Sequence, residues 1–229
     1  MIVLVTGAAK GIGRETARVL AERGETVIVS ARDGARAQQV ADELGGRAIE
    51  LDVTDDVSVA AAADALEELD VLINNAAAFV DWTELASAAD LATARAVLDT
   101  NLLGSWRVTQ AMLPLLRRSP HPRIVMVSSG GGSHADEQFG LTRRGGAAAS
   151  YGISKAALNA LTATLAAELA DTPILVNAVC PGLTATWPGA EQMGARPVGE
   201  GAASVLWAAT LADDGPRGGF FRDGEPLGW

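Results

Sequence analysis

Short apolar runs without polar alternation recur along the chain, and segments with helical spacing of apolar residues separate them. A strand buried on both faces lacks the usual alternation, and parallel strands need a crossover connection, commonly a helix. The pattern therefore predicts an α/β fold, a doubly wound parallel sheet with helices on both faces. The predicted strands are residues 3–5, 26–30, 48–52, 71–74, 124–128, 174–179 and 219–222.

Apolar spacing and end signals place helices between these strands. Gly24 is a natural C-cap for the helix that begins near Ile12, and Thr54 is the expected N-cap of the third helix. Pro114 is expected to kink or restart the long helical stretch 88–117. The predicted helices are residues 12–23, 35–44, 55–69, 88–117, 151–169 and 199–211.

Length and charge exclude several classes of protein. With 229 residues, no internal repeat and no low-complexity linker, the chain is expected to form one domain, residues 1–229. No run approaches the roughly 18 apolar residues of a membrane span, and no leader precedes the first strand, so a cytoplasmic location is expected. The net charge of −10 disfavours nucleic acid and anionic membranes as partners. One cysteine and two isolated histidines predict neither an internal disulfide nor a metal site.

A glycine loop joins the first strand to the first helix. Its sequence is Thr6-Gly-Ala-Ala-Lys-Gly-Ile-Gly13, and its spacing departs from the common Gly-x-Gly-x-x-Gly fingerprint. Glycines let the backbone approach a pyrophosphate, which the helix N-terminus then holds. A plain tight turn is the alternative interpretation, but the position between strand and helix favours dinucleotide binding.

The end of the second predicted strand bears on which dinucleotide is bound. Ser30-Ala-Arg32 places a guanidinium where an NAD-type domain usually carries an acid, and Lys10 adds a second cation. These charges suit a 2′-phosphate and predict NADP(H) in preference to NAD(H); the alternative is that both are ordinary surface charges. Asp52 and Val53, after the third strand, are placed to contact adenine; a helix-capping role for Asp52 is nearly as good.

Tyr151 and Lys155 lie four residues apart at the start of a long helical run, so their side chains project from one helix face. A neighbouring ammonium favours phenolate and is expected to lower the pKa of Tyr151 from about 10 toward neutrality. Such a phenol is a proton donor or acceptor of useful strength. An exposed tyrosine beside a solvated lysine is the ordinary alternative for an isolated pair.

The order of these motifs resembles that of the short-chain dehydrogenase/reductase family over essentially the whole chain. The family pattern is Thr-Gly-x-x-x-Gly-x-Gly, Asn-Asn-Ala-Gly, a catalytic asparagine, a serine, Tyr-x-x-x-Lys and Pro-Gly, and all occur here in that order. Ala77 replaces the glycine of the second motif. The resemblance implies a single-domain Rossmann fold. The wide spacing between Ser129 and Tyr151, with the closing segment 218–229, resembles the carbonyl-reductase branch.

The resemblance implies four catalytic residues. Tyr151 matches the proton donor, and Lys155 matches the lysine that binds the nicotinamide ribose and depresses the tyrosine pKa. Ser129, rather than Ser128, matches the serine that holds the carbonyl oxygen, because the family places it in Ser-x-x-Gly. Asn101 matches the asparagine that supports a water-linked proton relay to the lysine.

The resemblance also implies the cofactor contacts. The segment that begins at Pro181 matches the one that meets the nicotinamide amide, with Thr186 as the expected side-chain contact. The expected cofactor-binding residues are Gly7, Lys10, Gly11, Ile12, Gly13, Arg32, Asp52, Val53, Asn75, Ala76, Tyr151, Lys155, Pro181, Gly182, Thr184 and Thr186.

These features together predict an NADP(H)-dependent oxidoreductase that reduces a ketone or aldehyde by hydride transfer, or runs the reverse alcohol oxidation. A non-catalytic NADP(H)-binding sensor on the same fold is the alternative. A sugar-nucleotide epimerase is disfavoured, because 229 residues leave little room for its substrate domain.

The substrate pocket is expected to draw on the aromatic cluster after the fourth strand and on two irregular stretches, residues 130–150 and 183–197, which follow strand ends. An apolar or aromatic carbonyl compound suits these residues. Trp82 and Trp187 fit a core or interface position equally well. The expected aromatic and apolar contributors are Phe79, Val80, Trp82 and Trp187.

Small residues form a second face of the predicted 151–169 helix and would allow close approach of a partner helix. This face predicts a homodimer, unless the 130–150 insertion covers it. Its members are Gly152, Ala156, Ala160, Ala163 and Ala167.

Overall fold

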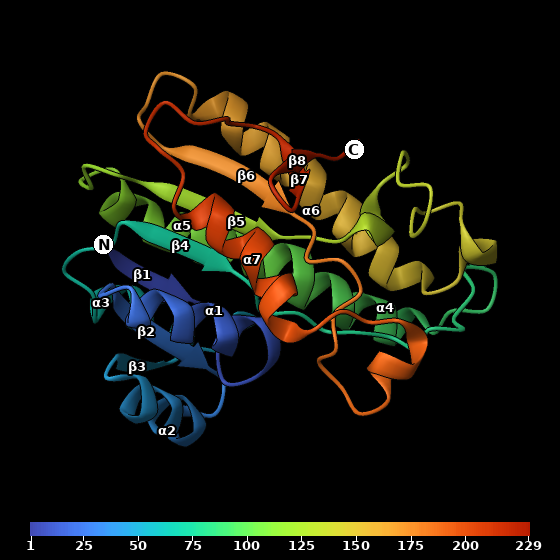
Figure 1. Ribbon diagram of the computed structural model, residues 1–229, viewed down its shortest axis with the longest axis horizontal. Coiled ribbons are helices and arrows are strands. Elements are labelled where there is room, and N and C mark those ends of the chain that lie inside the picture. The colour runs from blue at the N-terminus through green and yellow to red at the C-terminus, as the bar shows by residue number, and fades with distance from the viewer.

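The structure is a computed structural model that describes all 229 residues. At its centre lies an eight-stranded sheet in the order β3-β2-β1-β4-β5-β6-β7-β8, in which only the β7–β8 pair is antiparallel (Figure 1). The predicted α/β fold with a doubly wound parallel sheet is therefore confirmed. The strands are β1 (Ile2–Val5), β2 (Thr26–Ala31), β3 (Arg47–Glu50), β4 (Val71–Asn74), β5 (Arg123–Val127), β6 (Leu175–Val179), β7 (Phe220–Arg222) and β8 (Glu225–Pro226).

Helices cover both faces of this sheet, and none of them is both long and apolar enough to cross a bilayer. Helices α1, α2 and α7 pack on one face, whereas α3, α5 and α6 pack on the other (Figure 1). The helices are α1 (Gly11–Glu22), α2 (Gly34–Leu44), α3 (Asp56–Asp64), α4 (Leu91–Leu98), α5 (Ser105–Leu116), α6 (Ala149–Glu168) and α7 (Val198–Ala209).

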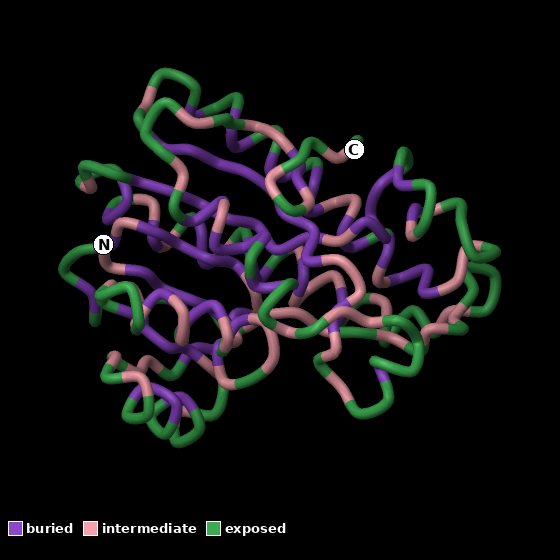
Figure 2. Tube along the Cα trace, in the orientation of Figure 1, coloured by how far each residue is buried: buried purple, intermediate pink, exposed green.

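The two faces of the sheet bury separate apolar clusters. Leu4 and Ile28 point into the cluster under α3, α5 and α6, while Val3 and Val5 point into the cluster under α1, α2 and α7. Burial on both sides explains why the strands show no polar alternation. Figure 2 shows the central strands buried and the outer turns exposed.

Several predicted boundaries were wrong. The helix predicted through residue 69 ends at Asp64, although Leu66 and Leu69 are still buried in the core. Its N-cap is Asp55, whose carboxylate accepts hydrogen bonds from the first backbone N–H groups, and not Thr54. The hydroxyl of Thr54 instead donates to Asp52 Oδ1 at 2.7 Å.

The long helical stretch also differs from its prediction. It begins at Leu91, and Pro114 lies inside α5 without ending it. The irregular turn lies earlier, as a π-helical segment at Asp99–Gly104 that contains Asn101. Such π-helical segments widen a helix by one residue per turn and often mark functional positions.

Strand β8 was missed at the end of the chain. Asp223 and Gly224 both have positive φ, 56° and 83°, and connect β7 to β8 as a hairpin. An Asp-Gly pair next to apolar residues is a recognised hairpin signal, so the sequence contained the information.

Candidate active site

Two adjoining cavities open at the carboxyl ends of the central strands, where open α/β sheets bind ligands. The larger one has a volume of about 1000 Å³ and the smaller one about 130 Å³. They share lining residues that include Ile12, Asn75, Trp82 and Thr186, so together they form one cleft.

The predicted catalytic and cofactor-binding residues divide between the two cavities, and among them only Asn101 lines neither. The larger cavity is lined by Gly7, Lys10, Gly11, Ile12, Gly13, Arg32, Asp52, Val53, Asn75, Ala76 and Thr186. The smaller cavity is lined by Ser129, Tyr151, Lys155, Pro181, Gly182 and Thr184, together with Ile12, Asn75 and Thr186.

The glycine loop forms one end of the larger cavity and leaves no room for a side chain at Gly7 or Gly13. A Cβ added at Gly7 would lie 2.9 Å from Ala76 Cα, and one at Gly13 would lie 2.4 Å from Asn75 Nδ2. Helix α1 begins at Gly11, within the loop, and Lys10, its N-cap, makes no side-chain capping bond to the first turn. Free backbone N–H groups at a helix N-terminus suit a phosphate group, so this end fits the pyrophosphate of a dinucleotide.

Asn75 has a supporting role that sequence reasoning did not identify. Its side-chain amide donates to Thr6 O at 2.8 Å, and its backbone N–H donates to Thr6 Oγ1 at 2.9 Å. Ala76 N donates to the same hydroxyl at 2.9 Å. These bonds clamp the glycine loop to the end of β4, so Asn75 both lines the cleft and fixes its shape.

Three cations line the far end of the larger cavity. Lys10 and Arg32 were predicted, whereas Arg36, in the first turn of α2, was missed. None of the three is in an ion pair within the protein. Asp33 also lines this cavity but forms no ion pair with the three cations, and its carboxylate caps α2 by accepting the Arg36 backbone N–H at 3.0 Å.

Asp52 is held by its own loop. Thr54 donates both its backbone N–H, at 2.9 Å, and its hydroxyl to Asp52 Oδ1. Partial burial opposes ionisation, but these hydrogen bonds and the positive charge of Arg32 leave the pKa of Asp52 lowered. Asp52 is therefore a fixed acceptor beside the cavity and not the cap of α3.

Tyr151 lies near the start of α6, and its side chain lines the smaller cavity. Its ring stacks on Phe79 with centroids 5.2 Å apart and meets Trp82 edge-on at 5.7 Å. The expected lowering of its pKa by Lys155 was wrong. Burial raises the pKa of Tyr151 and outweighs the opposing hydrogen bond with Ser129.

Lys155 is buried one helical turn from Tyr151. Its Nζ lies 5.8 Å from the centre of the Tyr151 ring and donates to Val127 O at 2.8 Å. Burial lowers the pKa of Lys155 to about 8. The ammonium is thus costly to bury, and two of its three N–H donors have no protein acceptor.

The two adjacent serines are in different environments. Ser128 donates to Asn159 Oδ1 and is buried, so its hydroxyl is used inside the protein. Ser129 Oγ accepts the Gly131 N–H at 3.0 Å and lines the smaller cavity. The Ser129 proton is therefore available in the cavity, whereas the Ser128 proton is not.

Asn101 lies behind the site. Its amide nitrogen donates to Ala78 O at 3.0 Å and Ser154 Oγ at 2.9 Å, and its Oδ1 accepts the Ala78 N–H at 2.7 Å. The side chain therefore joins the loop after β4 to α6. It positions the walls that carry Phe79 and Tyr151, and the proton relay expected of Asn101 has no direct side-chain contact with Lys155 here.

The loop after β6 forms the opposite wall. Cys180, which sequence reasoning did not single out, lines the smaller cavity, and its Sγ accepts N–H groups from Gly130 at 3.0 Å and Gly182 at 3.3 Å. Thr186 approaches the glycine loop, because a Cβ added at Gly11 would lie 3.2 Å from its Cγ2. The walls of the two cavities thus meet at this loop.

Aromatic residues close the smaller cavity. Trp82 and Trp187 stack with ring centroids 5.9 Å apart and line both cavities, so neither is a core residue. Phe79 also lines both cavities, but Val80 lines neither. From the 130–150 insertion, the cavity receives Phe139 and Arg144, which the sequence analysis did not name individually.

Comparison with known proteins adds a family assignment to this geometry. The model for the family described as short chain dehydrogenase matches residues 1–193. The oxidoreductase UcpA of Salmonella typhimurium is 37% identical over 217 residues, which cover 89% of this chain and 76% of UcpA.

Solved structures agree with this assignment. NADPH-bound carbonyl reductase from chicken fatty liver has a TM-score of 0.84 and 27% identity, covering 99% of this chain and 98% of that one. A 3-oxoacyl-[acyl-carrier protein] reductase from Brucella melitensis with bound NAD has a TM-score of 0.83 and 30% identity, covering 99% and 91%.

The buried ammonium of Lys155 predicts a specific pH dependence of stability without cofactor. The unfolded chain holds the Lys155 proton more tightly than the folded protein, because the pKa falls from 10.5 to about 8 on folding. The free-energy cost of burying the charged Lys155 side chain is fully present below pH 8. This cost is lost as the pH rises toward 10.5. Relative to Lys155→Met, the wild type should gain about 1–3 kcal/mol in unfolding free energy between pH 7 and pH 10.

Urea unfolding of both proteins at several pH values measures this difference. The exposed Lys10, changed to methionine, controls for loss of a surface lysine. If the difference in unfolding free energy between wild type and Lys155→Met stayed constant from pH 7 to pH 10, the assignment of a buried, charged Lys155 would be contradicted.

Proposed function

Because the chain belongs to the short-chain dehydrogenase/reductase family and is an oxidoreductase, we propose that it reduces a ketone or aldehyde to an alcohol with NADP(H), or runs the reverse reaction. The observation that carries this proposal is the convergence of Ser129, Tyr151 and Lys155 on the aromatic cavity that adjoins the glycine-loop cavity.

Tyr151 is the acid of the proposed reaction. Its raised pKa keeps the phenol protonated at neutral pH, as reduction requires, because the oxygen of the reduced carbonyl must receive a proton. Ser129 donates a hydrogen bond to the same oxygen and stabilises the negative charge that develops there. A bound nicotinamide would supply or accept the hydride.

Lys155 assists the proposed proton transfer electrostatically. Its ammonium, with a pKa of about 8, is mostly charged at neutral pH and stabilises phenolate once the proton has left Tyr151. Its two free N–H donors are available to hydroxyl groups of a ribose. Burial beneath Tyr151 keeps both groups out of bulk water.

Charge at the far end of the cleft supports NADP(H) over NAD(H). Lys10, Arg32 and Arg36 line the larger cavity without protein ion pairs, in a chain of net charge −10. A 2′-phosphate would pair with these cations. Similar structures include both NADPH-bound and NAD-bound proteins, so the preference rests on these side chains.

A carbonyl-reductase type of activity is part of the proposal. The 130–150 insertion contributes Phe139 and Arg144 to the smaller cavity, and the chicken carbonyl reductase structure covers nearly the whole chain. The aromatic walls suit a small carbonyl compound with an apolar or aromatic part.

Replacing Tyr151 tests the proposed acid. Tyr151→Phe retains the stacking on Phe79, so the dissociation constant for NADPH should stay within about twofold of wild type. The kcat/KM for a carbonyl substrate should fall by about 10²–10⁴, because the general acid is lost. A panel of ketones, quinones and aldehydes, followed by NADPH absorbance, provides the measurement.

The adjacent serines supply a matched control. Ser129→Ala should also lower kcat, whereas Ser128→Ala should affect stability more than turnover, since the Ser128 hydroxyl donates to Asn159 Oδ1 inside the protein. Substantial turnover by Tyr151→Phe would overturn the assignment. Tight NADPH binding by the wild type without turnover on any compound would instead support a non-catalytic sensor.

Arginine replacements test the cofactor preference. Arg32→Ala and Arg36→Ala should each weaken NADPH binding by about tenfold and leave NADH binding nearly unchanged, because each removes a charge-assisted bond to the 2′-phosphate. Titration of both cofactors by fluorescence measures the two affinities. Arg23→Ala removes an exposed cation outside the cleft as the control. Equal losses of affinity for NADPH and NADH would refute the proposed contact between these arginines and the 2′-phosphate.

The exposed part of α6 supports a homodimer, which we also propose. Gly152 is covered by the insertion, since an added Cβ would lie 3.0 Å from Leu141 Cδ2, but Ala160, Ala163 and Ala167 are exposed. Light scattering should give twice the chain mass of 23.5 kDa, and Ala163→Arg should give the monomer mass. A wild-type monomer across the concentrations tested would remove the proposal.

A further inference from the structure

One charged group in the smaller cavity has no part in the reaction proposed above. Arg144 lines this cavity together with Ser129, Tyr151 and Lys155. No aspartate or glutamate lines it, although acids outnumber bases 28 to 18 in the chain. The cavity that would receive the substrate is therefore locally positive in an acidic protein.

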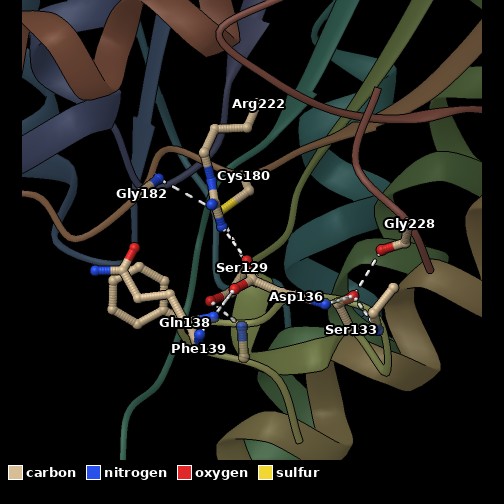
Figure 3. Close-up of polar contacts among 12 residues, drawn as sticks. Ser129, Ser133, Asp136, Gln138, Phe139, Cys180, Gly182, Arg222 and Gly228 are labelled. Atoms are coloured by element: carbon tan, nitrogen blue, oxygen red, sulfur yellow. Dashed lines mark hydrogen bonds and ion pairs between the residues drawn. The ribbon is translucent and has the colours of Figure 1, made fainter. Parts of the chain in front are cut away.

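Arg144 differs from the second arginine near the same ring. The guanidinium carbons of Arg144 and Arg222 each lie 5.7 Å from the centre of the Phe139 ring. Arg222 is neutralised by Asp136, a carboxylate that is only 4% exposed, and it also contacts Cys180 (Figure 3). Arg144 has no carboxylate partner.

Phe139 is itself fixed by the Asp136 carboxylate. Asp136 Oδ1 accepts the backbone N–H groups of Gln138 at 2.8 Å and Phe139 at 2.7 Å, as Figure 3 shows. An arginine over an aromatic ring loses little freedom when its donors bind an anion, because the ring already supports the planar group. Phe139 therefore holds Arg144 at the cavity while leaving its N–H donors available.

The backbone at Arg144 is also unusual. Its φ is +52°, a left-handed conformation that is unfavourable for residues other than glycine, and Gly145 and Gly146 follow with φ of +66° and +75°. Beyond this turn the chain is anchored, because Ser150 N donates to Glu84 Oε2 at 2.7 Å. Non-glycine residues in this conformation occur more often at functional sites.

We propose that the substrate is an aromatic carbonyl compound that carries a carboxylate, and that Arg144 binds this carboxylate while the ring lies against Phe79, Trp82 and Trp187. This inference rests on the proposed function for the identity of the reacting carbonyl. A guanidinium binds a carboxylate through two parallel N–H donors. The volume of about 130 Å³ is close to the roughly 150 Å³ of a cavity that holds one benzene ring.

Binding of matched acids and esters tests this inference without turnover. The probes are aryl keto acids with different spacings between ketone and carboxylate, each compared with its methyl ester. Protein loaded with NADP⁺ is titrated with each probe, and quenching of tryptophan fluorescence is recorded, because Trp82 and Trp187 line the cavity. The wild type should bind at least one acid about tenfold or more tightly than its ester.

Variants assign the preference to one side chain. Arg144→Met should abolish the preference for the acid and leave affinity for the ester near wild type. Arg144→Lys should keep part of the preference for the acid. Arg143→Met is the matched control, because Arg143 is the adjacent exposed arginine and does not line the cavity. The acid preference should also weaken as ionic strength rises, since Arg144 is exposed.

Turnover of the same probes separates this inference from the proposed function. Reduction of esters and acids with equal kcat/KM would overturn the role of Arg144 and leave the reductase activity standing. Preferential binding of acids without reduction of any compound would support the Arg144 site and overturn the reductase proposal. Equal binding of acid and ester by the wild type, or an unchanged ratio in Arg144→Met, would overturn the inference.

Discussion

The site depends on one buried ammonium held by one backbone carbonyl. Lys155 Nζ donates to Val127 O, which joins α6 to the carboxyl end of β5. The same helix approaches the Gly130–Gly132 turn so closely that a Cβ at Gly132 would lie 2.5 Å from Ala156 N. These two contacts set how far Tyr151 reaches into the cleft and where Ser129 stands opposite it. Burial of the charged lysine is unfavourable for folding, but it leaves two unpaired N–H donors at the cavity wall, where a ligand can satisfy them.

Much of the fold followed from local pattern, because burial on both faces removes alternation from each strand independently of its neighbours. The choice of Ser129 over Ser128 likewise came from spacing, and the structure places the two hydroxyls in different surroundings. The pKa of Tyr151 could not be obtained in this way. Its direction is set by burial, to which Phe79 and Trp82 contribute from a loop distant in sequence, and the nearby cation was the only cause visible in the helix itself.

Other features depended on contacts between distant segments. Asn75 was expected to face the cofactor, yet its amide also clamps the glycine loop, and nothing in its own motif shows which atoms it will meet. The π-helical turn at Asn101 has no local signature, because it arises where the helix must meet both the loop after β4 and α6. By contrast, the missed β8 hairpin had a readable signal, because an Asp-Gly pair follows the apolar residues of β7.

Buried and exposed polar groups have different roles in the cleft. Lys155 is buried and Tyr151 is half-buried, so salt screens the interaction between them less than it screens a pair of exposed charges. Exposed Arg32 and Arg144 stand at opposite ends of the cleft, where the net charge of −10 otherwise repels anions. The C-terminal segment stabilises one of these ends, because Ser133 Oγ donates to Gly228 O and Arg222 pairs with Asp136, which in turn orders Phe139. The insertion is thus tied to the chain terminus through Ser133 and Asp136, and to the helix turn of Lys155 and Ala156 through Gly132, so the segment that carries Arg144 also borders the reacting groups.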